Sequence, residues 1–206
     1  VYQLYSQYGN QELKAEKSKT AELGLEFQHR LFSSRVVYFH RTTQDAIDFN
    51  YISYKYFNLT QLTANGAELE IKAMPVKGLN ITGNYSYLKT SEVAQSRIDF
   101  KDTVYQYALR RPMHVLNLQM GYQATKGLYA SISAKAVSKR FDIGGYQQPD
   151  LLLPAYFIIN AYAEYALTKQ LKCFADVQNL TNKKFFDING FTSIPFLLNT
   201  GIFFQL

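Results

Sequence analysis

The chain has 206 residues, a net charge of +6, 18% charged residues, one cysteine and three histidines. Cys173 alone excludes an intramolecular disulfide, and the histidines lie too far apart for a metal-ligand spacing, so we expect no metal site and no cofactor. No apolar run reaches the roughly 18 residues of a transmembrane helix, and no basic run interleaves with stacking aromatics, so we expect no nucleic-acid partner.

The N-terminal residues, from Val1 to Tyr5, contain no initiator Met and no basic or apolar leader. We therefore expect a piece of a longer chain. Tyr and Phe are abundant, with 17 and 15 copies, and they favour half-buried strands. Much of the polarity comes from Asn, Gln, Ser and Thr, which suits a wall with one apolar and one hydrated face.

Alternation of apolar and polar residues predicts about nine strands of about ten residues each. It is clearest where Leu23, Leu25 and Phe27 alternate with polar residues and glycine, because a helix would spread these three side chains around its axis. The predicted strands cover residues 20–28, 35–42, 66–73, 79–86, 116–123, 128–135, 156–164, 171–178 and 198–206.

The connections alternate in length. Short ones at 29–34, 74–78, 125–127 and 167–170 separate long ones at 43–58, 89–111, 138–154 and 179–194. Short turns at one rim and long loops at the other are typical of an outer-membrane barrel. The sequence therefore predicts an all-β, antiparallel, up-and-down transmembrane β-barrel wall in contact with outer-membrane lipid, with its long loops outside the cell.

One face of this wall is expected to line a hydrated lumen and to carry charges of both signs, mostly paired with one another. These residues are Glu22, Glu26, Glu68, Glu70, Lys72, Lys135, Glu164, Lys172 and Asp176. Gly24, Gly66 and Gly121 fall on the same face, where they allow close approach or bending. Aromatic residues near strand ends, namely Tyr85, Tyr87, Tyr122 and Phe157, are predicted to form an interfacial girdle.

Four short motifs occur in order along the chain. They are Gly9-Asn10 with Glu16, Gly66 with Glu68, Arg111-Pro112, and Asn179-Leu180 within Val177–Lys183. Each has a structural interpretation: a turn, a close strand contact, a strand entry and a capped loop. In this order they resemble motifs of TonB-dependent outer-membrane receptors, although Gln11 and Ala15 stand where that family often has proline and the chain end at Phe203–Leu206 departs from its terminal aromatic.

The resemblance implies a barrel of about 22 strands around a plug. Residues 1–206 are then expected to be the C-terminal portion of the barrel domain, without the plug. It also implies import of a scarce nutrient, such as siderophore-iron, cobalamin or a glycan, across the outer membrane of a Gram-negative-type bacterium. The remaining strands and the plug would be partners, and TonB would act through the missing N-terminal part. Loop aromatics are the candidate substrate contacts: Tyr105, Tyr107, Phe141 and Tyr146.

Two other functions fit the same pattern. One is a passive outer-membrane pore or structural barrel, and the other is a soluble β-barrel or β-sandwich binding module. An enzyme is not expected, because the sequence contains no Ser-His-Asp arrangement with its turn context, no phosphate-binding loop and no zinc signature.

Overall fold

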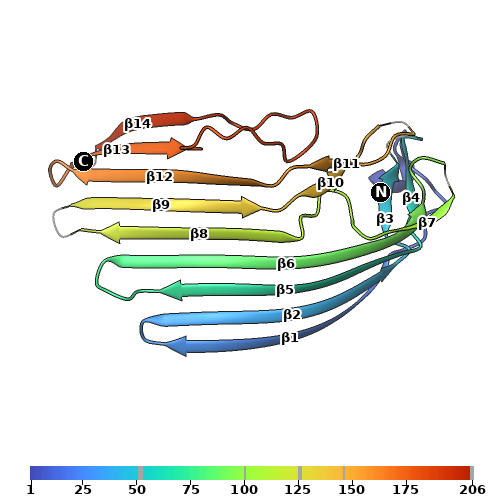
Figure 1. The fold of residues 1–206 in the computed structure, drawn as a ribbon, viewed down its shortest axis with the longest axis horizontal. Helices are drawn as coiled ribbons and strands as arrows, with labels where there is room; N and C mark the ends of the chain where they lie inside the picture. Colours follow the sequence, from blue (N-terminus) through green and yellow to red (C-terminus); the bar gives the residue numbers. More distant parts are fainter. Residues whose placement is uncertain (51–52, 100, 125–126, 146, 205–206) are drawn as a thin grey trace.

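The computed structural model describes residues 1–206 except 51–52, 100, 125–126, 146 and 205–206. A single sheet dominates it, and smaller hairpins lie at one end (Figure 1). The elements are α1 (Tyr2–Tyr5), β1 (Lys17–His29), β2 (Phe32–Gln44), β3 (Ile47–Asn50), β4 (Lys55–Asn58), β5 (Gln61–Ala73), β6 (Leu79–Gln95), β7 (Asp102–Tyr105), β8 (His114–Gln123), β9 (Leu128–Val137), β10 (Arg140–Asp142), β11 (Leu151–Leu153), β12 (Tyr156–Ala166), β13 (Leu171–Gln178) and β14 (Leu197–Phe204).

The main sheet is antiparallel and follows the chain in the order β1-β2-β5-β6-β8-β9-β12-β13-β14, with β7 paired to the far end of β6. Figure 1 shows it as a curved wall. The nine strands along this path confirm the predicted up-and-down arrangement. No helix among the described residues is both long and apolar enough to cross a membrane.

The connections confirm the predicted asymmetry. The short turns lie at one end of the wall, and the long loops gather with β3, β4, β7, β10 and β11 at the other, which we call the loop end (Figure 1). The predicted length of about ten residues is wrong for the first strands: β1, β2 and β5 have 13 residues and β6 has 17. Their ladders continue beyond the alternating segments, because β2, β5 and β6 stay paired into the loop end.

Strand register separates the residues into two faces. One row of directly paired residues runs across seven strands on the apolar face, and the next row runs across six strands on the polar face. The apolar row is Leu25, Val36, Leu69, Tyr85, Leu116, Ala136 and Phe157, and the polar row is Glu26, Arg35, Glu70, Asn84, Asn117 and Lys135. The apolar face is widely exposed: Leu25 is 71% accessible and Ile202 is 68%.

The expected pairing among the charges of the polar face is wrong for most of them. Of the nine residues named for that face, only Lys172 and Glu164 form an ion pair in the described part of the chain, at 3.4 Å. The register explains part of this, because Lys135 lies opposite Asn117 and Ile158, and Lys72 lies opposite Ser33 and Thr82.

Glycines on the polar face make room for aromatic rings. A Cβ at Gly66 would overlap the ring of Phe39, its partner on β2, and a Cβ at Gly121 would lie 2.6 Å from the Tyr129 hydroxyl. The predicted close approach is therefore confirmed at Gly66 and Gly121. At Gly24 the nearest atom lies 3.7 Å away, so this glycine is not required by crowding.

The loop end holds most of the buried residues. Ala46, Leu59 and Ala94 form a small apolar cluster with Phe57 and Leu62 packed against it. The buried polar residues in the described part of the chain belong to the same end: Thr43, Glu92, Arg140, Asp142 and Asn179. The wall itself therefore has two accessible faces, whereas its loop end has a core of its own.

Candidate functional site

The candidate site is the loop end together with the hollow directly below it on the polar face. The N-terminal segment is fastened there to the β3–β4 hairpin. Asn10 donates from Nδ2 to the carbonyl oxygen of Tyr56 at 3.0 Å, and Glu16 Oε2 accepts from the backbone N–H of Ile47 at 3.0 Å. A Cβ at Gly9 would collide with the backbone of Leu4 and Tyr5, so this position needs glycine.

Arg97 is the centre of a buried polar network. Its guanidinium donates to Asp150 Oδ2 at 2.9 Å and to Glu92 Oε1, and the side chains of these two carboxylates are 2% and 3% accessible. The guanidinium carbon also lies 4.2 Å from the ring centroid of Tyr105. One planar cation thus joins β6, the β7 hairpin and the segment before β11, an arrangement for which arginine is better suited than lysine.

Three of the four predicted aromatic residues meet in this network. The rings of Tyr107 and Phe141 stack with centroids 3.8 Å apart, and Tyr105 lies 5.5 Å from Tyr107. The Tyr107 hydroxyl donates to Asp150 Oδ2 at 2.8 Å. Burial, together with this hydrogen bond to Asp150, raises the pKa of Tyr107, so the hydroxyl remains a donor at neutral pH. Tyr146 lies outside the described residues.

A second network, the β10 latch, fastens the last long loop. It consists of Arg140 and Asp142 on β10 with the loop residues Phe186, Asp187 and Asn189. Arg140 donates to the Phe186 carbonyl oxygen and, at 2.9 Å, to Asp187 Oδ1, while Asn189 N–H donates to Asp142 Oδ2 at 2.6 Å.

Asp142 is the most buried group of the β10 latch. Its side chain is 0% accessible, and its Oδ1 accepts from Arg110 Nε at 2.6 Å and from Ile143 N–H at 2.8 Å. Burial opposes ionisation of this carboxyl, but the hydrogen bonds from Asn189, Arg110 and Ile143 outweigh it and lower its pKa. Asp142 is therefore ionised at neutral pH.

Asn179 anchors the start of the same loop. It is 4% accessible, has a φ of 49°, and donates from Nδ2 to the carbonyl oxygens of Lys183 and Ile194. Asn182 Oδ1 accepts from the N–H of Phe196 at 2.9 Å. The predicted bonding to nearby backbone groups is confirmed for Asn179, which bonds to Lys183, whereas the bond to Asn182 comes from Phe196, 14 residues away. Leu180 donates its N–H to the carbonyl oxygen of Ile159 at 2.8 Å.

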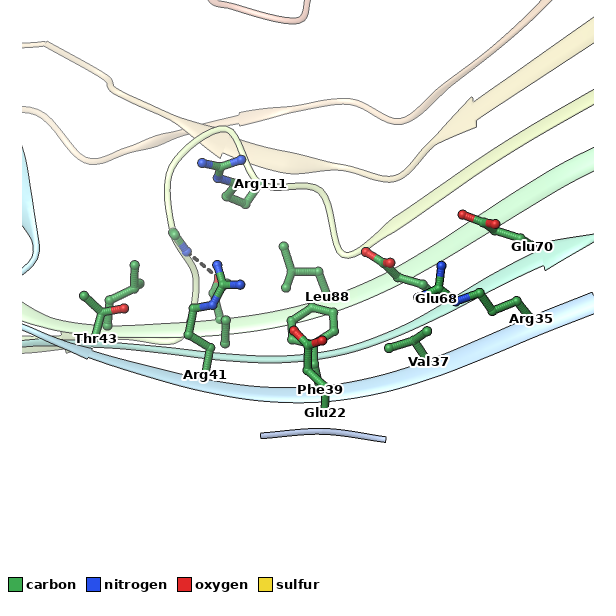
Figure 2. A pocket seen from close by; sticks show the side chains of 14 residues that line it. Glu22, Arg35, Val37, Phe39, Arg41, Thr43, Glu68, Glu70, Leu88 and Arg111 are labelled. Atoms are coloured by element: carbon green, nitrogen blue, oxygen red, sulfur yellow. Dashed lines mark hydrogen bonds between the residues drawn. The ribbon is translucent and has the colours of Figure 1, made fainter. Parts of the chain in front are cut away.

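Below the loops, the polar face contains a hollow of about 450 Å³, which we call the lumenal hollow. Figure 2 shows Arg111 projecting from the loop above it and Arg41 rising from β2. The loop is held to β6 by a hydrogen bond of 2.8 Å from Ala108 N–H to Thr90 Oγ1. The charged residues that line the hollow are Glu22, Arg35, Arg41, Glu68, Glu70 and Arg111.

These six charges make no ion pair with one another or with any other group in the described part of the chain. Arg41 donates instead to Thr20 Oγ1 at 3.2 Å. The lumenal hollow therefore presents charged groups that can pair with a bound anion or with another polypeptide segment. Pro112 was predicted to begin a strand. It lies just before β8 instead, because β8 begins at His114.

Sequence reasoning missed Glu92, Arg97, Asp142 and Asp150, which the structure places among its most buried charges. The only local signal was aromatic residues close to charged ones in long loops. No group of three or more His, Cys, Asp or Glu residues able to hold a metal occurs among the residues described.

Comparison with known proteins gives one family match. The model of the "TonB dependent receptor-like, beta-barrel" family matches residues 1–180. The ferric enterobactin receptor of Pseudomonas aeruginosa is 26% identical over 202 residues, which cover 86% of this chain and 26% of that receptor. The chain thus spans about a quarter of this curated relative.

Solved structures share the fold. The ferripyoverdine receptor of the Pseudomonas aeruginosa outer membrane superposes with a TM-score of 0.75 at 16% identity, covering 95% of this chain and 28% of that one. The ferric-catecholate import receptor Fiu of E. coli K12 superposes with a TM-score of 0.69 at 20% identity, and the match covers 93% of this chain and 28% of Fiu. At these identities the likeness concerns the fold alone.

Proposed function

This chain belongs to the TonB-dependent receptor β-barrel family, and on that premise we propose that it forms the C-terminal barrel portion of an outer-membrane receptor for a ferric siderophore. Two observations support the substrate class: a curated relative is a ferric enterobactin receptor, and the lumenal hollow lies beside the loop end. Of the three nutrients considered from the sequence, siderophore-iron is the one that these relatives favour.

The arginines of the lumenal hollow carry this proposal. Arg41 and Arg111 point toward the space under the loops, and neither forms an ion pair with a described residue (Figure 2). Many ferric siderophores are anions, and catecholate ones present aromatic rings as well. A guanidinium group can both pair with such an oxygen anion and stack on a ring, so the two arginines suit this chemistry.

The loop aromatics have a supporting role in the proposal. Tyr105 packs on Tyr107, and Tyr107 packs on Phe141. Tyr105 also lies against the Arg97 guanidinium, and these contacts tie the loops together above the lumenal hollow. Direct ligand contact by their exposed edges remains a prediction. The plug, TonB and the remaining strands act through parts of the protein outside these residues.

Binding of a ferric siderophore to the full-length receptor tests the proposal, using ferric enterobactin as the probe and intrinsic fluorescence quenching as the signal. We expect R41Q and R111Q each to raise the Kd about tenfold, the equivalent of one charge-assisted hydrogen bond. R30Q is the matched control, because Arg30 is an exposed arginine in the short β1–β2 turn at the opposite end.

Three results would contradict the proposal. The first is an unchanged Kd in both R41Q and R111Q. The second is an equal loss in R30Q, which would indicate a non-specific effect of charge. The third is tight binding of a glycan or cobalamin with no binding of any ferric siderophore, which would move the substrate to another class.

A further inference from the structure

The apolar face of the wall carries an open groove near the loop end that the proposed receptor function does not use. It has a volume of about 670 Å³ and is lined by residues of β6, β8, β9 and β12. These four strands are neighbours in the wall (Figure 1). Its lining includes Tyr85, Leu116, Ala136 and Phe157, which are paired side by side in the apolar row. The groove exists because Ala136 is small: its methyl group lies between the larger side chains of Leu116 and Phe157.

The end of the groove nearest the loops is polar. His114 lies there, with its Nδ1 hydrogen-bonded to the Tyr85 hydroxyl at 2.7 Å, and its backbone N–H donates to Ser138 Oγ at 3.0 Å. The groove therefore changes from apolar to polar along its length. This gradient matches the change from hydrocarbon to headgroup at a membrane surface.

Lys183 closes the polar end, and its backbone is held in place. Buried Asn179 accepts from the Lys183 N–H at 2.9 Å and donates to its carbonyl oxygen at 2.9 Å. The Lys183 side chain is exposed and makes no ion pair with any described residue. Its ammonium group therefore carries an uncompensated positive charge at the headgroup end of an apolar channel.

We propose that this groove is a binding site for one membrane lipid with a phosphate headgroup. An acyl chain lies over Ala136 between Leu116 and Phe157, and the phosphate pairs with the ammonium group of Lys183. The charge of the phosphate complements Lys183, and the apolar floor suits a hydrocarbon chain and no water-soluble anion. The inference rests on the proposed outer-membrane setting, but not on any particular transported ligand.

Native mass spectrometry of the full-length receptor in detergent tests the site, with phosphatidylglycerol as the probe and no ferric ligand present. We expect a resolved one-to-one complex. K183Q is expected to weaken it about fivefold, which corresponds to the roughly 1 kcal/mol that one basic residue contributes at an anionic membrane surface. A136L fills the floor of the groove and is expected to weaken it at least as much.

Two matched controls keep the result specific. K77Q removes a lysine from the short β5–β6 turn, and A130L enlarges an exposed alanine on the same face of β9, toward the opposite end. Neither is expected to change lipid binding. Diacylglycerol with the same chains, which lacks the phosphate, is expected to bind about as weakly as phosphatidylglycerol binds to K183Q.

Wild-type lipid affinity in K183Q or A136L would overturn the proposal. Displacement of the lipid by millimolar inorganic phosphate would also overturn it, because the groove would then be a simple anion site. Equal binding of diacylglycerol would do the same. The lipid proposal and the receptor proposal can fail independently. R111Q is expected to weaken ferric-siderophore binding without changing lipid binding. A136L is expected to weaken lipid binding without changing ferric-siderophore binding.

Discussion

The wall and the loop end are held together in different ways. The wall is a set of antiparallel ladders with an accessible apolar face, on which Leu23 is 68% and Ile202 is 68% exposed. The loop end has a core of Ala46, Leu59 and Ala94 and buried ion networks around Arg97 and Asp142. The wall therefore depends on its surroundings to cover its apolar face, whereas the loop end buries its own groups.

The stability of the wall should therefore respond to a change of environment more than the stability of the loop end does. In the proposed outer-membrane setting, lipid covers the apolar side chains of the wall that no described residue covers. The loop end, in contrast, depends on pairs of residues far apart in sequence, such as Arg97 with Asp150 and Arg140 with Asp187. Four changes, in order of decreasing effect, should each act on one region and spare the other.

Removing Asp142 should break the loop end without disturbing the wall. D142A removes the carboxylate to which both Arg110 and the Asn189 N–H donate. We expect the free energy of local unfolding of this loop to fall by about 3 kcal/mol. This value is at the lower end of the range for breaking a buried ion pair, because Arg110 is partly exposed. Hydrogen exchange of residues 185–193 in the full-length protein measures it.

The control for D142A is D99A, because Asp99 is an exposed carboxylate whose ion pair with Lys101 is open to water. D99A should leave the hydrogen exchange of residues 185–193 as it is in the wild type, because exposed ion pairs contribute little to stability. Equal exchange in D142A and wild type would contradict the view that the β10 latch fastens this loop.

A charge placed on the apolar face should destabilise the wall alone. We expect L118R to cost about 2 to 4 kcal/mol in lipid vesicles, the range for arginine near the bilayer midplane. Urea unfolding of the full-length protein measures this loss. Q119R places the same charge one residue further along β8, on the polar face, and should change the free energy of unfolding little. The assignment of faces is refuted if Q119R costs more than L118R.

Crowding at one glycine tests the packing of the polar face. G66A forces the Phe39 ring from its position over β5 and should cost about 1 to 3 kcal/mol, as overpacking does elsewhere. G24A adds the same methyl group where the nearest atom lies 3.7 Å away, so a change near zero is expected. Similar unfolding free energies for the two variants would rule out the aromatic contact as the reason for Gly66.

Acidification should loosen the β10 latch with the smallest effect of the four, because protonation leaves the Asp142 side chain in place. The folded pKa of Asp142 is lower than its ordinary value of 3.8. Its ionised form therefore stabilises the fold fully above pH 3.8, and this contribution is lost as the pH falls through the folded pKa. Limited proteolysis by pepsin between pH 5 and pH 2.5 should show cleavage in 185–193 appearing only below 3.8, whereas D142N should be insensitive to pH over that interval.

The sequence predicted the wall better than the loop end, for a physical reason. A strand with one apolar face is visible as alternation, as at Leu23, Leu25 and Phe27, so the strands and their order could be deduced. Asn179 was also predictable, because asparagine commonly bonds nearby backbone groups. Of the four motifs that resemble the family, Asn179-Leu180 contains such a position, whereas Asn10, Glu16 and Gly66 contact residues far away in sequence.

The loop end could not be deduced in the same way. The hairpins β3–β4 and β10–β11 are short, lack regular alternation and form two-stranded sheets separate from the wall. Arg97 and Asp150 are 53 residues apart, so no spacing rule joins them. Charged loop residues are usually solvated, and for that reason Glu92 and Asp142 gave no sign that they would be buried.

The separate pairing of the small hairpins has a consequence for how the molecule can diverge. An extra residue inside β5 would exchange the lipid and lumen sides of every residue beyond it, because side chains alternate along a strand. An extra residue at the tip of the β3–β4 hairpin would shift nothing outside it, since these two strands pair only with each other among the described residues. Insertions and deletions are thus tolerated at the tips of the small hairpins and are disruptive within the long strands, so the loop end can vary in length without altering the wall.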